Sequence, residues 1–429
     1  MGVVLISTSD LGVLVKVLFT LLPATGSLQP LLPLAEELRG EGHDVAFVSS
    51  PRMGGDLARR GFGFFPGGLD WHASDADYVA RLCQAAGGLE FPGLAGPERF
   101  AWVTHNLFIG GAARTLIPDL VSIMEGWRPD LVVRESLEFA GCVVAEHLGL
   151  PHASVAAAAD CALDQRESLA VSLARLRDDI HLPPDSDMGM PYRHLHLCFA
   201  PPSFHGPDAR FPPTARFFRT STETADEGSI PEHITRSPSR VLASLGTVFH
   251  RTPGLIEAIV AAMRDEAVDL DVAVGFDQDP ARLGPQPPNV HVEAWLPIAK
   301  RLRQCDLFIT HGGFNGVKEA LTGGVPMVVM PIAGDQHYAA SRCEALGLAE
   351  VIKPDDRTAE GIRTAALRVL HDPRYQLRAT EVRVQMEALP PIEAATKALH
   401  ELVLTKATAP QTLLQSRRDG IFWAVEPTS

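Results

Sequence analysis

The chain has 429 residues, 46% of them hydrophobic and 21% charged, which is enough apolar material for two globular domains and is not the composition of a disordered protein. Its formal net charge of −14 argues against nucleic-acid binding, because such proteins cluster Lys and Arg to neutralise phosphates. The six cysteines have no C-x-x-C spacing, and no uninterrupted apolar run approaches the ~20 residues that cross a bilayer, so we expect a cytoplasmic protein with no membrane partner.

The N-terminal half predicts a parallel sheet with helices between its strands. After an extension over residues 1–14, we expect apolar strands at 15–20, 44–48, 130–133 and 153–155, with helices over 31–39 and around 143–145. Apolar strands that alternate with helices are typical of buried parallel sheets. We assign residues 15–215 to this first domain.

A second alternating unit follows a segment rich in Pro, Ser and Thr. We place a linker at 216–235, the second domain at 236–388, a C-terminal helix at 389–404 and a tail at 405–429. The strands expected in the second domain cover residues 240–246, 271–274, 290–292, 306–310, 325–330 and 349–352. The predicted fold class is α/β, with two Rossmann-like, doubly wound parallel sheets that face each other across a cleft.

The richest motif follows the predicted strand 306–310. His311-Gly312-Gly313 ends that strand, and a helix is predicted to begin at Phe314. Glycines let the backbone approach a ligand closely, and the free N–H groups at a helix start bind anions such as phosphate. Asn315 and Glu319 share one helix face, so we expect Asn315 beside a phosphate and Glu319 beside ribose hydroxyls.

Other strand ends of the second domain carry further candidates. Ligands of open α/β sheets gather at the carboxyl ends of the strands, where Thr247 offers a hydroxyl to phosphate and Asp335-Gln336 can bind neighbouring sugar hydroxyls. Trp295 suits stacking on a nucleobase, and by itself it fits a half-buried core tryptophan equally well.

From Trp295 to Gln336 the order of these features resembles the donor signature of the family-one nucleotide-sugar glycosyltransferases, especially the bacterial branch that decorates polyketides and macrolides. The resemblance implies a GT-B fold whose final helix returns to the N-terminal domain. It implies that Trp295 stacks on the base, that Glu319 binds ribose and that Asp335 and Gln336 hold the sugar. The diphosphate would lie against Thr247, His311, Asn315 and Gly316, and Gly313 and Phe314 are the remaining donor-binding residues.

The resemblance also implies an inverting, metal-independent reaction that uses no cofactor and takes a UDP- or dTDP-sugar as co-substrate. The helix start at Phe314 and His311 would supply the charge that a metal otherwise offers to the leaving diphosphate. The partners expected are the nucleotide sugar and a small, mostly apolar aglycone, and a homodimer stays open.

The catalytic base departs from the family pattern. The family has Gly-His-x-x-Pro in the loop after the first strand, and here the loop is Gly26-Ser27-Leu28-Gln29-Pro30. Ser27 therefore stands where the base should be, and an unassisted hydroxyl is too weak a base at neutral pH. The family's second N-domain residue is an acid that orients the His, and here it is Glu135, which either serves as the base after burial raises its pKa or forms an ion pair with Arg134 or another cation. Asp70, His72 and His105 are alternative bases in the acceptor loops.

The predicted function is sugar transfer to a small natural product. A catalytically degenerate subunit that binds nucleotide or aglycone beside a partner enzyme is the alternative, which Ser27 favours and the complete donor motif disfavours. A nucleotide-sugar epimerase fits the long donor motif less well, and an NAD dehydrogenase is disfavoured because no G-x-G-x-x-G follows the first strand.

Overall fold

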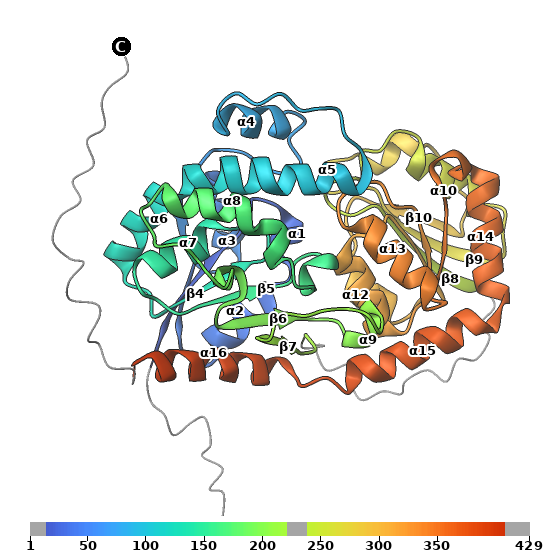
Figure 1. Cartoon of the computed structure of the whole chain (residues 1–429). Helices are drawn as coiled ribbons and strands as arrows, with labels where there is room; N and C mark the ends of the chain where they lie inside the picture. The colour runs from blue at the N-terminus through green and yellow to red at the C-terminus, as the bar shows by residue number, and fades with distance from the viewer. Residues whose placement is uncertain (1–13, 221–237, 408–429) are drawn as a thin grey trace, which may run out of the picture.

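The computed structural model describes residues 14–220 and 238–407. The chain forms two α/β units that lie side by side, each built on one sheet whose strand pairs are all parallel (Figure 1). The predicted fold class is confirmed. The predicted extension and most of the predicted linker and tail lie outside the described residues.

The first sheet has seven strands in the order β3-β2-β1-β4-β5-β6-β7. They are β1 (Lys16–Thr20), β2 (Asp44–Ser49), β3 (Gly63–Pro66), β4 (Leu131–Glu135), β5 (His152–Val155), β6 (Leu195–Cys198) and β7 (Ala215–Phe217). Alternate residues of β1 enter different clusters: Val17 and Phe19 pack on one face, and Leu18 packs on the other. Both faces are therefore buried, which is why most residues of these strands are apolar.

Helices cover both faces of this sheet. The helices of this half of the chain are α1 (Thr25–Leu28), α2 (Leu32–Gly40), α3 (Gly54–Arg59), α4 (Tyr78–Ala85), α5 (Gly96–Val103), the π-helical η3 (Thr104–Ala113), α6 (Arg114–Trp127), α7 (Ala140–His147), α8 (Arg166–Asp178) and α9 (Pro202–His205).

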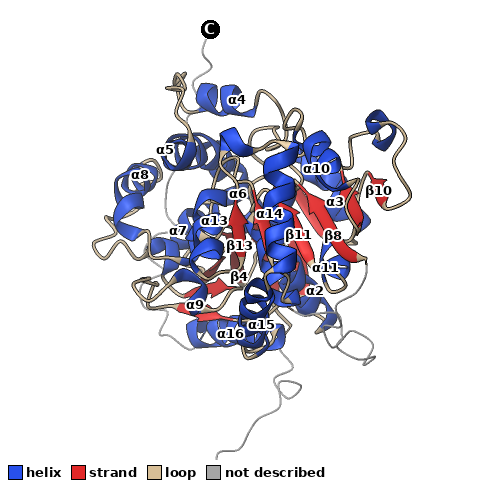
Figure 2. Ribbon diagram, turned by 90° about the vertical axis from the view of Figure 1, so that its right-hand side faces the viewer, coloured by secondary structure: helices blue, strands red, loops and turns tan. Residues whose placement is uncertain are grey.

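The second sheet has six strands in the order β10-β9-β8-β11-β12-β13, and Figure 2 shows it with helices around it. The strands are β8 (Ser239–Ser244), β9 (Val268–Ala273), β10 (Val290–Glu293), β11 (Leu307–Thr310), β12 (Met327–Val329) and β13 (Ala349–Val351). The helices are α10 (Leu255–Met263), α11 (Ile298–Leu302), α12 (Phe314–Gly323), α13 (Gln336–Ala345), α14 (Ala359–His371), α15 (Pro373–Glu387) and α16 (Ile392–Ala407).

Two predicted boundaries need correction. The first domain does not end at residue 215, because β7 pairs with β6 through residue 217 and the predicted linker therefore starts inside a strand. The C-terminal helix begins at Ile392 rather than 389, because Pro390 and Pro391 interrupt the chain after α15. The strands β3, β6 and β7 escaped the sequence analysis because each is short and lies beside prolines.

The C-terminal helix α16 packs on the first domain, although it follows the second (Figure 1). Its buried residues Ile392, Ala395 and Leu399 join the cluster that contains Leu34 of α2 and Phe19 of β1. In the other direction, Phe204 of α9 is completely buried in a cluster of the second domain. These reciprocal contacts join the two domains.

One continuous helix, Gly96–Trp127, is long and apolar enough to cross a membrane by those two criteria alone. Its apolar side chains Ile109, Leu116, Leu120 and Met124 are instead buried against the first sheet. Packing in the domain core accounts for its composition.

Candidate active site

The start of α12 forms the centre of the donor half. The helix begins at Phe314, and the residue before it, Gly313, supplies no side-chain cap to the first N–H groups. These unpaired donors and the positive end of the helix dipole make an anion site beside the ends of β8 and β11. The geometry fits a diphosphate.

His311 lies between two glycine backbones. A Cβ at Gly246 would stand 2.6 Å from the His311 Cε1, and one at Gly313 would stand 2.5 Å from its Nε2. Gly246 also has a φ of +72°, which other residues rarely adopt. Burial lowers the pKa of His311 to about 4, so its ring is neutral at pH 7. A neutral imidazole has a single N–H, which the Ser244 backbone already accepts, so His311 brings no charge to a phosphate and the charge expected from it must come from the helix start.

Two residues of α12 already have partners. The Asn315 Nδ2–H donates to the Gly26 carbonyl of the first domain at 2.9 Å, although a phosphate neighbour was expected. Glu319 forms an ion pair with the buried Lys318, with 3.3 Å between Oε1 and Nζ. Asn315 thus connects the donor helix to the loop that carries Ser27, and Lys318 holds the carboxylate predicted to bind ribose.

The predicted sugar-binding pair has two different environments. The Asp335 Oδ2 accepts a hydrogen bond from the Ala159 N–H of the first domain at 2.8 Å. The Gln336 Oε1 accepts from Ile332 N–H at 2.7 Å and from Ala333 N–H at 3.0 Å. The Gln336 carbonyl therefore shapes the loop after β12, which leaves its amide N–H groups as the donors that could meet a sugar.

Two exposed aromatic residues follow neighbouring strands of the second sheet. Trp295 follows β10 and is 64% exposed, and Phe276 follows β9 and is 59% exposed. The Gly275 N–H donates to the Ala294 carbonyl, which brings the two loops together. Trp295 is not a core tryptophan, so the stacking alternative is favoured. Phe276 was missed because a single Phe in a loop has no distinctive spacing.

The first domain contributes a buried carboxyl at the end of β4. Glu135 is 0% exposed, its Oε2 accepts from the Leu137 N–H at 3.0 Å, and its Oε1 is buried without a hydrogen-bond partner. Burial raises the pKa of Glu135 to about 8, against the opposing effect of the Leu137 hydrogen bond. None of the ion pairs among the described residues includes Glu135, with Arg134 or with another cation, so that alternative is wrong.

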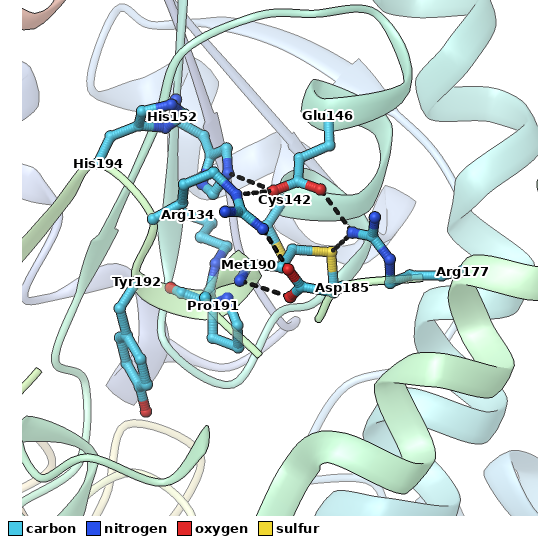
Figure 3. A network of polar contacts seen from close by, with 12 residues as sticks. Arg134, Cys142, Glu146, His152, Arg177, Asp185, Met190, Pro191, Tyr192 and His194 are labelled. Carbon is cyan, nitrogen blue, oxygen red and sulfur yellow. Dashed lines mark hydrogen bonds and ion pairs between the residues drawn. The ribbon is translucent and has the colours of Figure 1, made fainter. Parts of the chain in front are cut away.

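Arg134 holds the backbone around Glu135. Its buried guanidinium donates to the carbonyls of Glu135 at 3.2 Å, Ser136 at 2.9 Å, Glu138 at 3.0 Å and Pro191 at 2.6 Å. It lies beside a polar network in which Glu146 accepts hydrogen bonds from two other arginines, Arg177 among them (Figure 3). Sequence reasoning missed this role because a charged residue in a strand gives no sign of being buried.

The other candidate bases have different hydrogen-bond partners from Glu135. Ser27 is partly buried in α1, one residue after the Gly26 carbonyl that Asn315 contacts. Asp70 is exposed, and its carbonyl accepts from Arg81 at 2.9 Å. His72 lies 2.7 Å from the Ser74 hydroxyl and His105 lies 3.1 Å from the Ser172 hydroxyl, and burial lowers the pKa of each histidine.

A small, mostly apolar cavity lies beneath the acceptor loops. Its lining includes Leu22 after β1, Leu69 and Trp71 after β3, Phe108 of η3 and Glu138. The rings of Trp71 and Phe108 are stacked at 6.5 Å between centroids. The cavity lies between the segments that carry the candidate bases Asp70, His72 and His105.

Two family models match the chain, and both describe proteins like erythromycin biosynthesis protein CIII. The N-terminal domain model matches residues 36–178 and the C-terminal domain model matches residues 260–402. The chain belongs to this family.

The relatives of the chain include natural-product glycosyltransferases. It is 29% identical to demethyllactenocin mycarosyltransferase of Streptomyces fradiae, over 83% of this chain and 80% of that protein. It is 25% identical to 4'-demethylrebeccamycin synthase of Lentzea aerocolonigenes, over 90% of this chain and 99% of that protein. The predicted resemblance and the enzyme class are confirmed: the protein is a glycosyltransferase.

Solved structures agree on the fold. The calicheamicin glycosyltransferase CalG4 superposes with a TM-score of 0.72 at 23% identity, covering 92% of this chain and 100% of that chain. The glycosyltransferase VinC, solved with dTDP, superposes with a TM-score of 0.70 at 22% identity, covering 91% of this chain and 100% of that chain. The two-domain GT-B architecture of the chain is thereby confirmed.

Proposed function

We propose that the protein transfers a sugar from a UDP- or dTDP-sugar to a hydroxyl of a small, mostly apolar natural product, with inversion and without a metal ion. The observation that carries the proposal is the uncapped start of α12, beside His311 and facing the acceptor domain through the Asn315–Gly26 contact. The exposed Trp295 supplies a surface for the base. The dTDP in the VinC structure supports a thymidine nucleotide as one donor type.

The two domains would contribute different groups to the reaction. Glu135 would take the proton of the acceptor hydroxyl, and the acceptor oxygen would bond to the anomeric carbon as the bond from that carbon to the diphosphate oxygen breaks. The leaving diphosphate gains negative charge, which the α12 N–H groups would stabilise. Because Glu135 is completely buried, an acceptor reaches it only if the neighbouring side chains move.

The direct test is a panel of nucleotide sugars, with release of nucleoside diphosphate measured with and without an acceptor. Slow hydrolysis of one donor class, accelerated by an apolar hydroxyl acceptor, is expected. Firm binding of nucleotide and aglycone with neither hydrolysis nor transfer would favour the second candidate, a non-catalytic binding subunit. The observation behind that candidate is Ser27, which occupies the position of the family's base.

Replacing Glu319 by Ala is expected to lower the affinity for UDP or dTDP by roughly tenfold to a hundredfold, because a hydrogen bond to a charged group contributes ~1.5–3 kcal/mol. Calorimetric titration of the nucleotide measures the change, and the melting temperature checks the fold. The exposed Glu344 of α13 gives the matched control, since Glu344→Ala removes the same side chain from a neighbouring helix. Equal affinities in both variants would remove Glu319 from the nucleotide site.

Excess EDTA is expected to leave the initial rate of sugar transfer unchanged, because the start of α12 carries the diphosphate charge. Within residues 14–220 and 238–407, no three His, Cys, Asp or Glu side chains form a group that could hold a metal ion. Initial rates before and after chelation, with magnesium and manganese added back, measure the effect. Activity that disappears with EDTA and returns with either metal would contradict metal independence.

A further inference from the structure

The donor helix α12 contains a buried lysine to which the sequence analysis gave no role. Lys318 is 4% exposed, although lysine side chains are almost never fully buried unless they are paired. Its partner is the next residue of the helix, Glu319, with 3.3 Å between Nζ and Oε1. The Glu319 side chain is 27% exposed, so the ion pair joins a buried cation to a carboxylate that reaches solvent.

This ion pair lies on the side of α12 that faces the first domain. Lys318 and Glu319 are three and four residues after Asn315, so they share one face of the helix with it. The Asn315 Nδ2–H donates to the Gly26 carbonyl, which places this face against the first domain. Side chains of a helix lean toward its N-terminus, so both charged side chains lean toward the start of α12, where the diphosphate is proposed to bind.

The ion pair gives the two oxygens of Glu319 different environments. A carboxylate without other contacts can accept from two neighbouring hydroxyls, with one on each oxygen. Here Oε1 is directed to the buried ammonium group, which leaves Oε2 as the oxygen on the exposed side. One oxygen is therefore left for the sugar ring of the nucleotide, and it suffices for one hydroxyl.

We propose that Lys318 is a positioning residue that sets the specificity for the nucleotide's sugar: by holding Glu319 Oε1, it limits the carboxylate to one hydroxyl, so the site does not distinguish ribose from 2′-deoxyribose. The proposal rests on the proposed function, and it makes UDP- and dTDP-type donors equally acceptable to one site. The hydroxyl that Glu319 binds is the 3′-OH, because both nucleotides carry it. The 2′-OH of UDP receives no acceptor from this carboxylate.

The first measurement uses the unmodified protein and nucleotides with the same base. The affinities for UDP and 2′-deoxy-UDP, measured by calorimetric titration, are expected to agree within about threefold, because the additional hydroxyl of UDP has no partner. The nucleotide 2′,3′-dideoxy-UDP is expected to bind roughly tenfold to a hundredfold more weakly than 2′-deoxy-UDP, since it loses a hydrogen bond to a charged group. This comparison needs no variant.

The variant Lys318→Met frees the second oxygen of Glu319 and fills much of the space of the lysine side chain. The ratio of the affinities for UDP and 2′-deoxy-UDP is expected to rise roughly tenfold, because Oε1 can then accept the 2′-OH. A general loss of stability would weaken the binding of both nucleotides alike and would leave this ratio unchanged. Lys318→Arg keeps the cation and should keep the ratio of the unmodified protein.

Lys300→Met is the matched control, because Lys300 is an exposed lysine of α11, which packs against α12. It removes the same charge from the neighbouring helix and should not change the ratio. Combining Lys318→Met with Glu319→Ala should return the ratio to that of the unmodified protein, because no carboxylate is left to accept the 2′-OH. This double variant shows whether Lys318 acts through Glu319.

Two outcomes would overturn the inference: a preference of the unmodified protein for UDP over 2′-deoxy-UDP of roughly tenfold or more, or the same ratio in Lys318→Met as in Lys300→Met. Either result leaves donor binding and sugar transfer intact. Binding of neither UDP nor dTDP to the unmodified protein would instead contradict the proposed function.

Discussion

Replacing Glu135 by Gln is expected to lower turnover at least ~100-fold and to leave the affinity for UDP and dTDP unchanged. General-base catalysis is usually worth ~10²–10⁴-fold, and Gln has the shape of Glu without its basicity. Glu135 suits the role because burial raises its pKa to about 8, close to a working pH, and because its Oε1 has no other partner. Single-turnover rates and nucleotide calorimetry measure the two quantities separately.

The dependence of the transfer rate on pH tests whether the ionised Glu135 acts as the base. A base works in its ionised form, so the rate should rise with pH and level off above the pKa of Glu135, near 8. Glu135→Gln should abolish this limb. If the acceptor ionises unaided, the substitution should matter little and the limb should follow the acceptor's own pKa.

Placing a histidine at Ser27 is the complementary experiment. Ser27 follows the Gly26 carbonyl that Asn315 contacts, so Ser27→His introduces an imidazole at the contact between the two domains. Faster transfer to a plain alcohol in Ser27→His would show that the site lacks only the usual base. No transfer by either protein, despite nucleotide binding, would support the non-catalytic subunit.

Replacing Arg134 by Met is expected to destabilise the protein by at least ~3 kcal/mol, which would appear as a lower midpoint of denaturant unfolding. Arg134 is 0% exposed and donates to four backbone carbonyls around Glu135 and Pro191. Methionine fills much of the space but leaves buried acceptors unpaired, each at a cost of ~1–3 kcal/mol. Arg134→Lys keeps the charge, and its stability should lie between those of the unmodified protein and Arg134→Met, because a single ammonium group cannot reach all four acceptors.

Arg216 provides the control for this prediction. Its guanidinium also donates to two backbone carbonyls, of Pro213 at 3.3 Å and Ala215 at 2.8 Å, but the residue is exposed. Water can replace those hydrogen bonds, so Arg216→Met is expected to change stability by less than ~0.5 kcal/mol. Equal destabilisation by both substitutions would show that burial is not what makes Arg134 important.

The fold follows from local patterns in the sequence. The apolar strands around Val17, Val132 and Phe308 alternate with helices, and this alternation predicts parallel sheets because strands covered on both faces must be apolar throughout. The motif from His311 to Glu319 is equally local: its glycines and its helix start lie within nine residues, so one segment suffices to predict an anion site.

Partners across the cleft were not predictable in this way. The Asn315–Gly26 hydrogen bond joins residues 289 positions apart, and the Asp335–Ala159 hydrogen bond joins residues 176 positions apart. No periodic pattern relates such residues, because their distance depends on how two separately formed domains pack. The roles expected for Asn315 and Asp335 in donor binding stay predictions, since both side chains here contact the other domain.

The sequence by itself therefore determined the α/β class, the two-domain organisation, the donor motif and the absence of the usual base at Ser27, all of which depend on residue type and short spacing. Only the tertiary structure decided that Glu135 is buried with one free oxygen, that Arg134 holds the surrounding backbone and that Lys318 is buried beside Glu319. The physical reason is that burial and counter-charges belong to the environment of a side chain, and most of that environment comes from distant parts of the chain.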